Sequence, residues 1–434
     1  ISAPPSTPAT DDILKPHSLP PPRRRCSCLL FLFSFITVLF LFLSLLKLIE
    51  PPDVECRMNV PQIIRRWGYP VETHVVATDD GYLLQLHRIP HGRNNAFRRN
   101  ASCRPVIFLQ HGLEMDSSNW VDNPPDQAAG FVFADAGFDV WIGNVRGNRY
   151  GKRHIYLNPD ADDDFWRFSW TEMSEHDLPA MIDRALKVSG APSLHYVGHS
   201  QGSLIMFARL AERPEFAKKI STFHALAPAT SVEHVKGLCR THQYLIPILQ
   251  TWFTSGSFGP DNFYRKMLAT SLCSHEFFYG ICSLMIFELS GPQSRYFNAS
   301  RTAVYFSHIF SGTSSQNIIH WTQMMASYTT QKYDYNDENR NRAAYNQEKP
   351  PTYDFSTVAV PLHLYWGAND YLASAEDIEG ELIPQLNYSA IQSQKKLAEY
   401  NHFDFVWGTE AVDDIYAPIA HDVRRAERGR KCAV

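Results

Sequence analysis

The stretch "GHSQG", residues 198–202, places a serine between two glycines, after the apolar run "LHYV" and before the helix-like run "SLIMFARLAE". A serine hydroxyl is a weak nucleophile at neutral pH and requires an adjacent base. Between a strand and a helix this pattern exposes the serine on a tight turn, because glycines leave room for the two elements to approach. It predicts that Ser200 is the nucleophile of an acyl-transfer enzyme and that the backbone N–H of Gln201 faces the site. The alternative, a structural glycine turn with an exposed serine, is disfavoured by this context.

The partners of such a serine follow it in the chain, first an acid and then a histidine. Six aspartates lie between the serine and residue 402, and of these Asp370 alone directly follows a buried-strand run, "VAVPLHLYWGAND". The histidines after that point are His402, in a turn, and His421, on a helix-like stretch. The order predicts that Ser200 attacks, His402 transfers the proton and Asp370 orients the imidazole.

A second backbone donor for the oxyanion is expected in the loop after an early strand. The stretch "LQHGLEMDSSNW" provides Gly112 for the turn and the N–H of Leu113 as the donor. Each such donor contributes about 3–4 kcal/mol to transition-state stabilisation. The chain has neither paired CxxC motifs nor HExxH, so we expect no metal and no cofactor.

The surrounding pattern alternates strand-like and helix-like segments. A hairpin signal at residues 73–90 precedes continuous apolar runs at 105–112, 138–147 and 194–199. Strands that are apolar on both faces predict an α/β fold with a mostly parallel sheet covered by helices. From 230 to 357 the chain becomes aromatic-rich and irregularly helical. We expect core segments at 68–229 and 358–425 and a cap or lid at 230–357, the alternative being a domain unrelated to catalysis.

The N-terminal part contains a candidate membrane anchor. Residues 26–46 have no charge over 21 positions and follow three arginines, Arg23 to Arg25, at the end of a disordered basic tail, 1–25. This length spans a bilayer core, and the arginines favour a cytosolic N-terminus. We therefore expect a single-pass protein with a lumenal or extracellular catalytic part, joined by a linker at 47–67. A cleaved signal, giving a secreted or lysosomal protein, is the alternative.

Two further patterns agree with an oxidising compartment. Sequons occur at Asn100, Asn298 and Asn387, which are candidate glycosylation sites. Cys273 and Cys282 are close together in a loop-rich region and are the expected disulfide. The net charge of −4 gives no reason to expect nucleic acid as a partner.

Several motifs together resemble the acid lipase family, which includes gastric and lysosomal acid lipases and membrane-anchored steryl ester hydrolases. The motifs are "GYPVE" (68–72), "DDGYLLQLHRIP" (79–90), "QHGLEMDSSNWV" (110–121), "NVRGNRYG" (144–151), "FWRFSWTEM" (165–173), "DLPAMID" (177–183), "GHSQGS" (198–203), "GTSSQNIIHWTQ" (312–323) and "YNHFDFVWG" (400–408). The resemblance implies an α/β-hydrolase core with a helical cap. It also implies the triad Ser200, Asp370 and His402, an oxyanion hole from Leu113 and Gln201, and a cap disulfide between Cys273 and Cys282.

The expected function is hydrolysis of neutral-lipid esters, triacylglycerols or steryl esters, at a membrane or lipid interface. A short-chain carboxylesterase or thioesterase would use the same triad, and a non-catalytic binding or adhesion module would keep only the scaffold. Two apolar runs in the insertion, at 244–253 and 277–287, either form the cap's own core or contribute to lipid binding.

Overall fold

The computed structural model describes residues 53–94, 104–242, 256–259, 273 and 276–428. The chain divides into two units, residues 1–50 and 51–434, and all described residues belong to the second. The expected tail and anchor, the sequon at Asn100 and the apolar run 244–253 lie outside the described residues. Within the described ranges, no helix is long and apolar enough to cross a bilayer.

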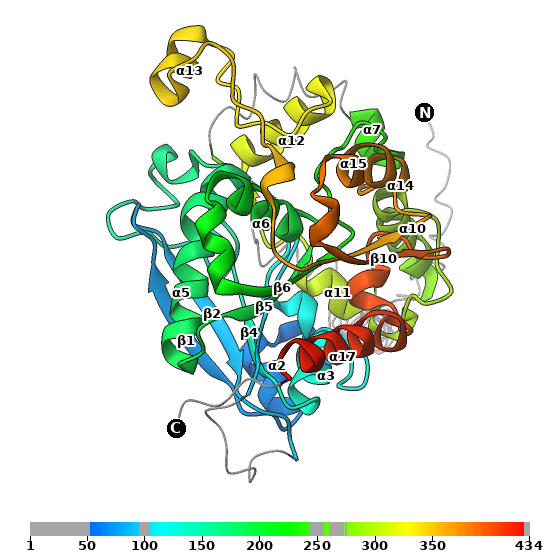
Figure 1. The fold of residues 1–434 in the computed structure, drawn as a ribbon. Coiled ribbons are helices and arrows are strands. Elements are labelled where there is room, and N and C mark those ends of the chain that lie inside the picture. Colours follow the sequence, from blue (N-terminus) through cyan, green and yellow to red (C-terminus); the bar gives the residue numbers. More distant parts are fainter. Residues whose placement is uncertain (1–52, 95–103, 243–255, 260–272, 274–275, 429–434) are drawn as a thin grey trace, which may run out of the picture. The chain divides into compact units, whose positions relative to one another are not determined.

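An eight-stranded sheet with the order β1-β2-β4-β3-β5-β6-β9-β10 forms the centre of the second unit (Figure 1). Its strands are β1 (Glu72–Ala77), β2 (Leu83–Ile89), β3 (Val106–Gln110), β4 (Asp139–Ile142), β5 (Leu194–His199), β6 (Ile220–Leu226), β9 (Leu362–Gly367) and β10 (Ile391–Leu397). The hairpin β1–β2 is antiparallel and pairs antiparallel with β4, whereas all pairs from β4 to β10 are parallel. The predicted α/β-hydrolase sheet is confirmed.

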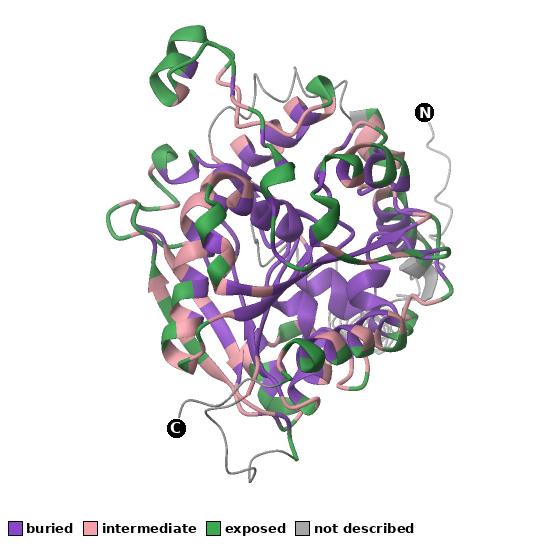
Figure 2. Cartoon of the chain, viewed as in Figure 1, coloured by how far each residue is buried: buried purple, intermediate pink, exposed green. Residues whose placement is uncertain are grey.

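Helices cover both faces of this sheet (Figure 1). The helices α5 (Leu178–Ser189) and α6 (Gln201–Glu212) pack on one face, and α3 (Ala129–Asp135) and α17 (Ala417–Ala426) pack on the other. Every residue of β3, β4, β5 and β9 is buried as a result, which explains their continuous apolar runs. The edge strand β1 alternates between half-buried and exposed residues. Figure 2 shows the same contrast between the central strands and the outer elements.

The insertion between β6 and β9 is mainly helical in its described part. It contains α7 (Gly237–His242), α10 (Glu276–Ser290), α11 (Thr302–His308), α12 (Ser315–Ser327) and α13 (Glu338–Tyr345), and the short strands β7 (Ser257–Phe258) and β8 (Thr313–Ser314) pair with each other. The cysteines expected to pair, Cys273 and Cys282, form a disulfide. The run 277–287 belongs to α10, while α13 is largely exposed (Figure 2).

The expectation of a linker over residues 47–67 is wrong for its described part. A short 3₁₀ helix, η1 (Val54–Arg57), precedes α2 (Val60–Arg66), and Asn59 forms a capping box with Gln62. The apolar side chains of α2 are buried against the core. Arg301 of the insertion also pairs with Asp53 and Glu55. Residues 53–67 are therefore a packed part of the second unit.

The other α-helices of the described ranges are short. They are α4 (Trp170–Glu172), α14 (Ala375–Asp377), α15 (Ile383–Gln385) and α16 (Asp404–Trp407).

Candidate active site

Ser200 lies at the junction of β5 and α6 with φ 55° and ψ −123°. A non-glycine residue in this region stores strain, which proteins retain mainly at functional sites. A Cβ on Gly198 would lie 2.7 Å from the carbonyl oxygen of Gly202, and one on Gly202 would lie 2.5 Å from that of Gln110. The glycines of the motif are therefore required for the close packing of β5, α6 and β3 around the strained serine.

Asp370 and His402 form a buried pair. Nδ1 of His402 lies 2.8 Å from Oδ2 of Asp370, and Oδ1 of Asp370 accepts hydrogen bonds from the backbone N–H groups of Leu372 and Ala373. Asp370 follows β9 and His402 follows β10. Because parallel strands end at the same edge of a sheet, both side chains meet there, at the edge where β5 delivers Ser200.

His199, which precedes the nucleophile, connects the serine turn to the His402 loop. Its Nε2 donates to the carbonyl oxygen of His402 at 3.0 Å, and the two imidazole rings are 4.8 Å apart. Burial, with the neighbouring His402 as a second cause, holds the pKa of His199 well below its usual range, so this ring stays neutral. Among the hydrogen bonds of the described residues, none joins the Ser200 hydroxyl to the His402 ring. Catalytic hydrogen bonds are often long before substrate binds and tighten in the complex.

The proposed oxyanion donors lie on either side of Ser200. Leu113 follows β3, and the adjacent Gly112 approaches so closely that a Cβ there would lie 3.0 Å from Cβ of Ser200. Gln201 begins α6, and the first N–H groups of a helix have no partner within it. No acceptor among the described residues is bonded to either amide, so both remain available to a developing negative charge.

The direction of the Leu113 amide is set by His111, a role that sequence reasoning missed. Nε2 of His111 accepts from the backbone N–H of Val145 and from Nδ2 of Asn148, so Nδ1 carries the proton and donates to the carbonyl oxygen of Gly112 at 2.8 Å. That carbonyl and the Leu113 N–H belong to one planar peptide unit. Burial lowers the pKa of His111 and keeps the ring in this neutral state. Its position directly before Gly112 was the available signal.

Comparison with known proteins agrees with this geometry. Residues 60–124 match the model of a partial alpha/beta-hydrolase lipase region, and residues 105–254 match the alpha/beta hydrolase fold. The Caenorhabditis elegans protein Lipase lipl-1 is 47% identical over 378 residues, covering 86% of this chain and 93% of that protein. Human gastric triacylglycerol lipase is 42% identical, with 86% of this chain and 92% of that protein covered. The chain belongs to the acid lipase family.

Two further similarities are consistent with that membership. Human lysosomal acid lipase/cholesteryl ester hydrolase is 40% identical over 377 residues, with 86% of this chain and 92% of that protein covered. The crystal structure of a lipase-like protein from Sulfolobus solfataricus superposes with a TM-score of 0.51 at 11% identity, covering 79% of this chain and 90% of that chain, which shows the shared fold. As a member of the acid lipase family, the protein is a carboxylic ester hydrolase.

Among the described residues, no hydrogen bond or ion pair joins His421, the second histidine considered in the sequence, to Ser200 or Asp370. It lies on α17 with 66% of its side chain exposed, and its Nδ1 lies 3.6 Å from Oδ1 of Asp422.

The two candidate glycosylation sites among the described residues differ in accessibility. Asn387 is exposed, whereas Nδ2 of Asn298, the atom that glycosylation would modify, donates to Oε1 of Gln127 at 2.9 Å.

A cavity of about 350 Å³ borders the loop that carries Asp370, called the acid loop below. Its lining is Gly280, Ser283, Leu284, Phe287, Glu288, Pro292, Gln293 and Tyr371. Most of these residues belong to α10 and the turn after it, and Tyr371 directly follows Asp370. Ser200 does not line this cavity.

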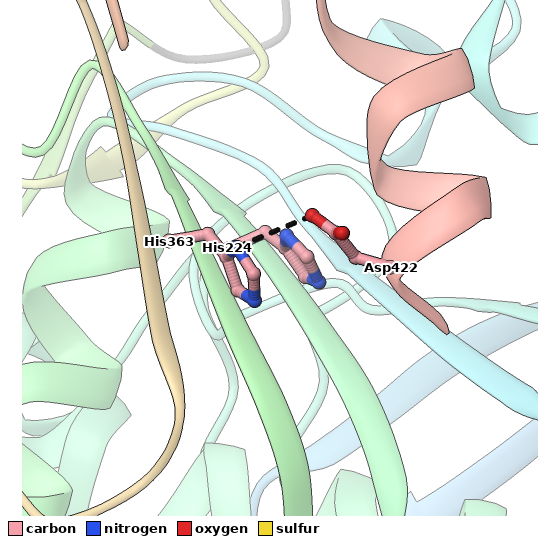
Figure 3. Close-up of side chains that lie close together, drawn as sticks. All are labelled: His224, His363 and Asp422. Atoms are coloured by element: carbon pink, nitrogen blue, oxygen red, sulfur yellow. Dashed lines mark ion pairs between the residues drawn. The ribbon is translucent and has the colours of Figure 1, made fainter. Parts of the chain in front are cut away.

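A cluster of His224, His363 and Asp422 lies away from the catalytic edge, between β6, β9 and α17 (Figure 3). The two imidazole rings are stacked, with centroids 4.4 Å apart and planes 16° from parallel. Nδ1 of His363 lies 2.8 Å from the Ser393 hydroxyl and 3.3 Å from Asp422. Lone pairs of stacked parallel rings do not converge on one ion, so this arrangement does not fit a tetrahedral metal site.

Proposed function

We propose that this chain hydrolyses esters of neutral lipids, triacylglycerols or steryl esters, through an acyl-enzyme on Ser200. The observation that carries the proposal is the buried Asp370–His402 pair at the sheet edge where β5 presents Ser200 in a strained conformation. Ser200, Asp370 and His402 follow three different strands, β5, β9 and β10, so the sheet, and not proximity in the chain, brings them to one edge.

The reaction uses groups of this chain alone. The Ser200 oxygen attacks the ester carbonyl while Nε2 of His402 takes the hydroxyl proton, and Asp370 stabilises the resulting imidazolium. The carbonyl oxygen becomes an oxyanion and is held by the N–H groups of Leu113 and Gln201. Collapse breaks the ester C–O bond, and His402 returns the proton to the leaving alcohol. Water then attacks the acyl-enzyme by the same route and releases the fatty acid and free Ser200.

The substrate class is supported by the relatives and by one surface. The human relatives are named for triacylglycerol and cholesteryl ester hydrolysis. On α10, Leu284 is 58% exposed and Met285 is 52% exposed, and Leu284 also lines the cavity beside the acid loop. Exposed apolar side chains grouped near an active site favour contact with a lipid interface.

The test compares a long-chain triacylglycerol or cholesteryl ester with a short soluble ester. We expect activity on the long-chain ester to rise sharply when the substrate forms aggregates. The variant Leu284→Ser/Met285→Gln should lose several-fold activity on aggregates and keep its activity on the soluble ester. Ile155→Ser removes an equally exposed apolar side chain outside the insertion and should have no effect. Smooth saturation through the aggregation point would favour the carboxylesterase alternative, and failure of a fluorophosphonate to label Ser200 would favour the non-catalytic one.

We also propose that the protein is membrane-anchored with its catalytic unit in the lumen or outside the cell. Support comes from the uncharged stretch 26–46 and from the exposed sequon at Asn387. The full chain should resist carbonate extraction, and glycosidase treatment should change the mass of the wild type but not of Asn387→Gln, if Asn387 is the site that is used. Recovery of a soluble protein that begins after residue 46 would support the secreted or lysosomal alternative.

A further inference from the structure

We propose that Trp321 and Asn317, two residues of the inserted cap, are positioning residues for the oxyanion hole and act through the side chain of Gln201. The proposal rests on the proposed role of Ser200 and adds a function to the cap. Under this proposal α12 helps to position an oxyanion donor, whether or not the insertion also binds lipid.

The Gln201 side chain is held on both sides of its amide. Oε1 of Gln201 accepts from Nε1 of Trp321 at 2.7 Å and from Nδ2 of Asn317 at 3.1 Å. Its Nε2 lies 3.4 Å from the Met173 sulfur. All of these side chains are buried, and an indole N–H can only donate, so the oxygen of Gln201 must face α12.

The two donors come from one rigid face of α12. Residues four positions apart lie on the same side of a helix, which lets Asn317 and Trp321 reach the same oxygen. The helix is itself fixed to the core, since Oδ1 of Asn317 accepts from the Trp170 backbone N–H at 2.8 Å. The ring of His320 also stacks on Trp170 with centroids 4.5 Å apart. These contacts fix Asn317 and Trp321 to the core. We call the two side chains that hold Oε1 of Gln201 the clamp.

A clamp at this residue matters because the backbone beside it is strained. Ser200 has a positive φ, and such a conformation persists only where its surroundings hold it on several sides. The N–H of Gln201 must lie about 2.7–3.1 Å from the oxyanion to be effective. A side chain held by two donors restrains the Cα of Gln201 and so restrains that N–H. Without these two donors the turn at Ser200 could relax. The Gln201 N–H would then stabilise the oxyanion of the transition state less, whereas binding of the substrate would change little.

The first test removes the N–H donor and keeps an aromatic side chain. Trp321→Phe should lower kcat on a short soluble ester about 10- to 100-fold, part of the effect of losing one oxyanion donor, with KM within about twofold of wild type. The rate of Ser200 phosphonylation by a fluorophosphonate should fall in parallel. Trp166→Phe is the matched control, because Nε1 of Trp166 also donates at 2.8 Å, to the carbonyl oxygen of Pro159. It should leave kcat unchanged.

The second test asks whether Trp321 acts through Gln201. Gln201→Met removes the acceptor at similar volume and keeps the backbone N–H, and it should lower kcat about as much as Trp321→Phe. In the Gln201→Met background, Trp321→Phe should cause no further loss, because the shared interaction is already absent. If Trp321→Phe does not fold, the Gln201→Met variant alone decides, since a kcat equal to wild type would overturn the proposal.

Other outcomes also overturn it. Multiplicative losses in the double variant would show that Trp321 acts independently of Gln201, and a raised KM with unchanged kcat would show that it only binds substrate. These results leave the proposed function intact, because wild-type activity and its loss in Ser200→Ala are measured in the same assay. Full activity of Ser200→Ala would instead overturn the proposed function itself.

Discussion

Nδ1 of His402 lies 2.8 Å from Oδ2 of Asp370, while Oδ1 of Asp370 is held by two backbone N–H groups. Both carboxylate oxygens are engaged, so the acid presents one fixed acceptor to the imidazole. An amide at this position would satisfy the loop with its oxygen and turn its NH₂ group toward His402. We expect Asp370→Asn to fold normally and to lose about 10³–10⁴-fold in kcat, because the histidine would adopt the wrong tautomer. Stopped-flow acylation would measure this loss, and a kcat within tenfold of wild type would contradict the assignment.

The two histidines that follow Asp370 should differ sharply when they are replaced. Ser200→Ala should abolish ester hydrolysis without loss of folding, and His402→Ala should be nearly as damaging. His421→Ala should be close to neutral, since that side chain is largely exposed on α17 and its carboxylate neighbour is Asp422, not Asp370. Turnover of a soluble ester and circular dichroism check all three variants. The opposite result for the histidines would show that the wrong one was assigned.

His111 should affect catalysis without contacting substrate. In His111→Ala the Gly112 carbonyl loses its side-chain donor, so the Leu113 amide is less well directed, and we expect kcat to fall about 10- to 100-fold at nearly constant KM. His91→Ala is a matched control, because Nδ1 of His91 makes the same bond to the carbonyl of the following residue, Gly92, at 2.9 Å. Equal effects of the two substitutions would point to general destabilisation.

Asp404 should make stability depend on pH near neutrality. Burial, and to a lesser degree the charge of Asp370, raises the pKa of Asp404 to about 7 from its ordinary 3.8. The folded state thus keeps a proton that the unfolded state releases, so this contribution to stability is complete below about pH 3.8 and is lost as pH rises towards 7. Each pH unit in that window removes about 1.4 kcal/mol.

The variant Asp404→Asn mimics the protonated acid and keeps an oxygen for the Asn401 N–H, which the wild-type carboxylate accepts at 2.8 Å. Its free energy of unfolding, measured by urea titration, should increase relative to wild type between pH 5 and pH 8. A difference that is constant with pH would show that Asp404 does not titrate in this range.

The disulfide between Cys273 and Cys282 should stabilise the insertion. A loop this short restricts the unfolded chain by about 2–3 kcal/mol. Replacing both cysteines by serine should lower the stability of the cap measured by hydrogen exchange, while exchange in β5 and β6 should stay unchanged. Cys239→Ser, at a free cysteine of the same insertion, is the control. Peptide mapping that found both thiols free would remove the basis for the prediction.

The sequence by itself determined the chemical type of the protein and most of its fold. The serine turn is a local feature, because the strand, the glycines and the helix that produce it are contiguous at residues 194–212. Buried parallel strands give continuous apolar runs, and their carboxyl ends share one edge, so the order of Ser200, Asp370 and His402 was sufficient to nominate a triad. Residues 53–67 differ from the expected linker because Asn59 caps α2 and the apolar side chains of that helix pack on the core.

Only the tertiary structure decided which residues support that triad. Gln201 meets Trp321 across 120 positions of sequence, and His199 meets the carbonyl of His402 across 203. The burial that raises the pKa of Asp404 likewise comes from packing around it. Hydrogen bonds of this kind depend on where whole elements pack, and neither periodicity nor turn chemistry encodes that information. Local pattern therefore identified the groups that react, and non-local packing determined the groups that hold them in place.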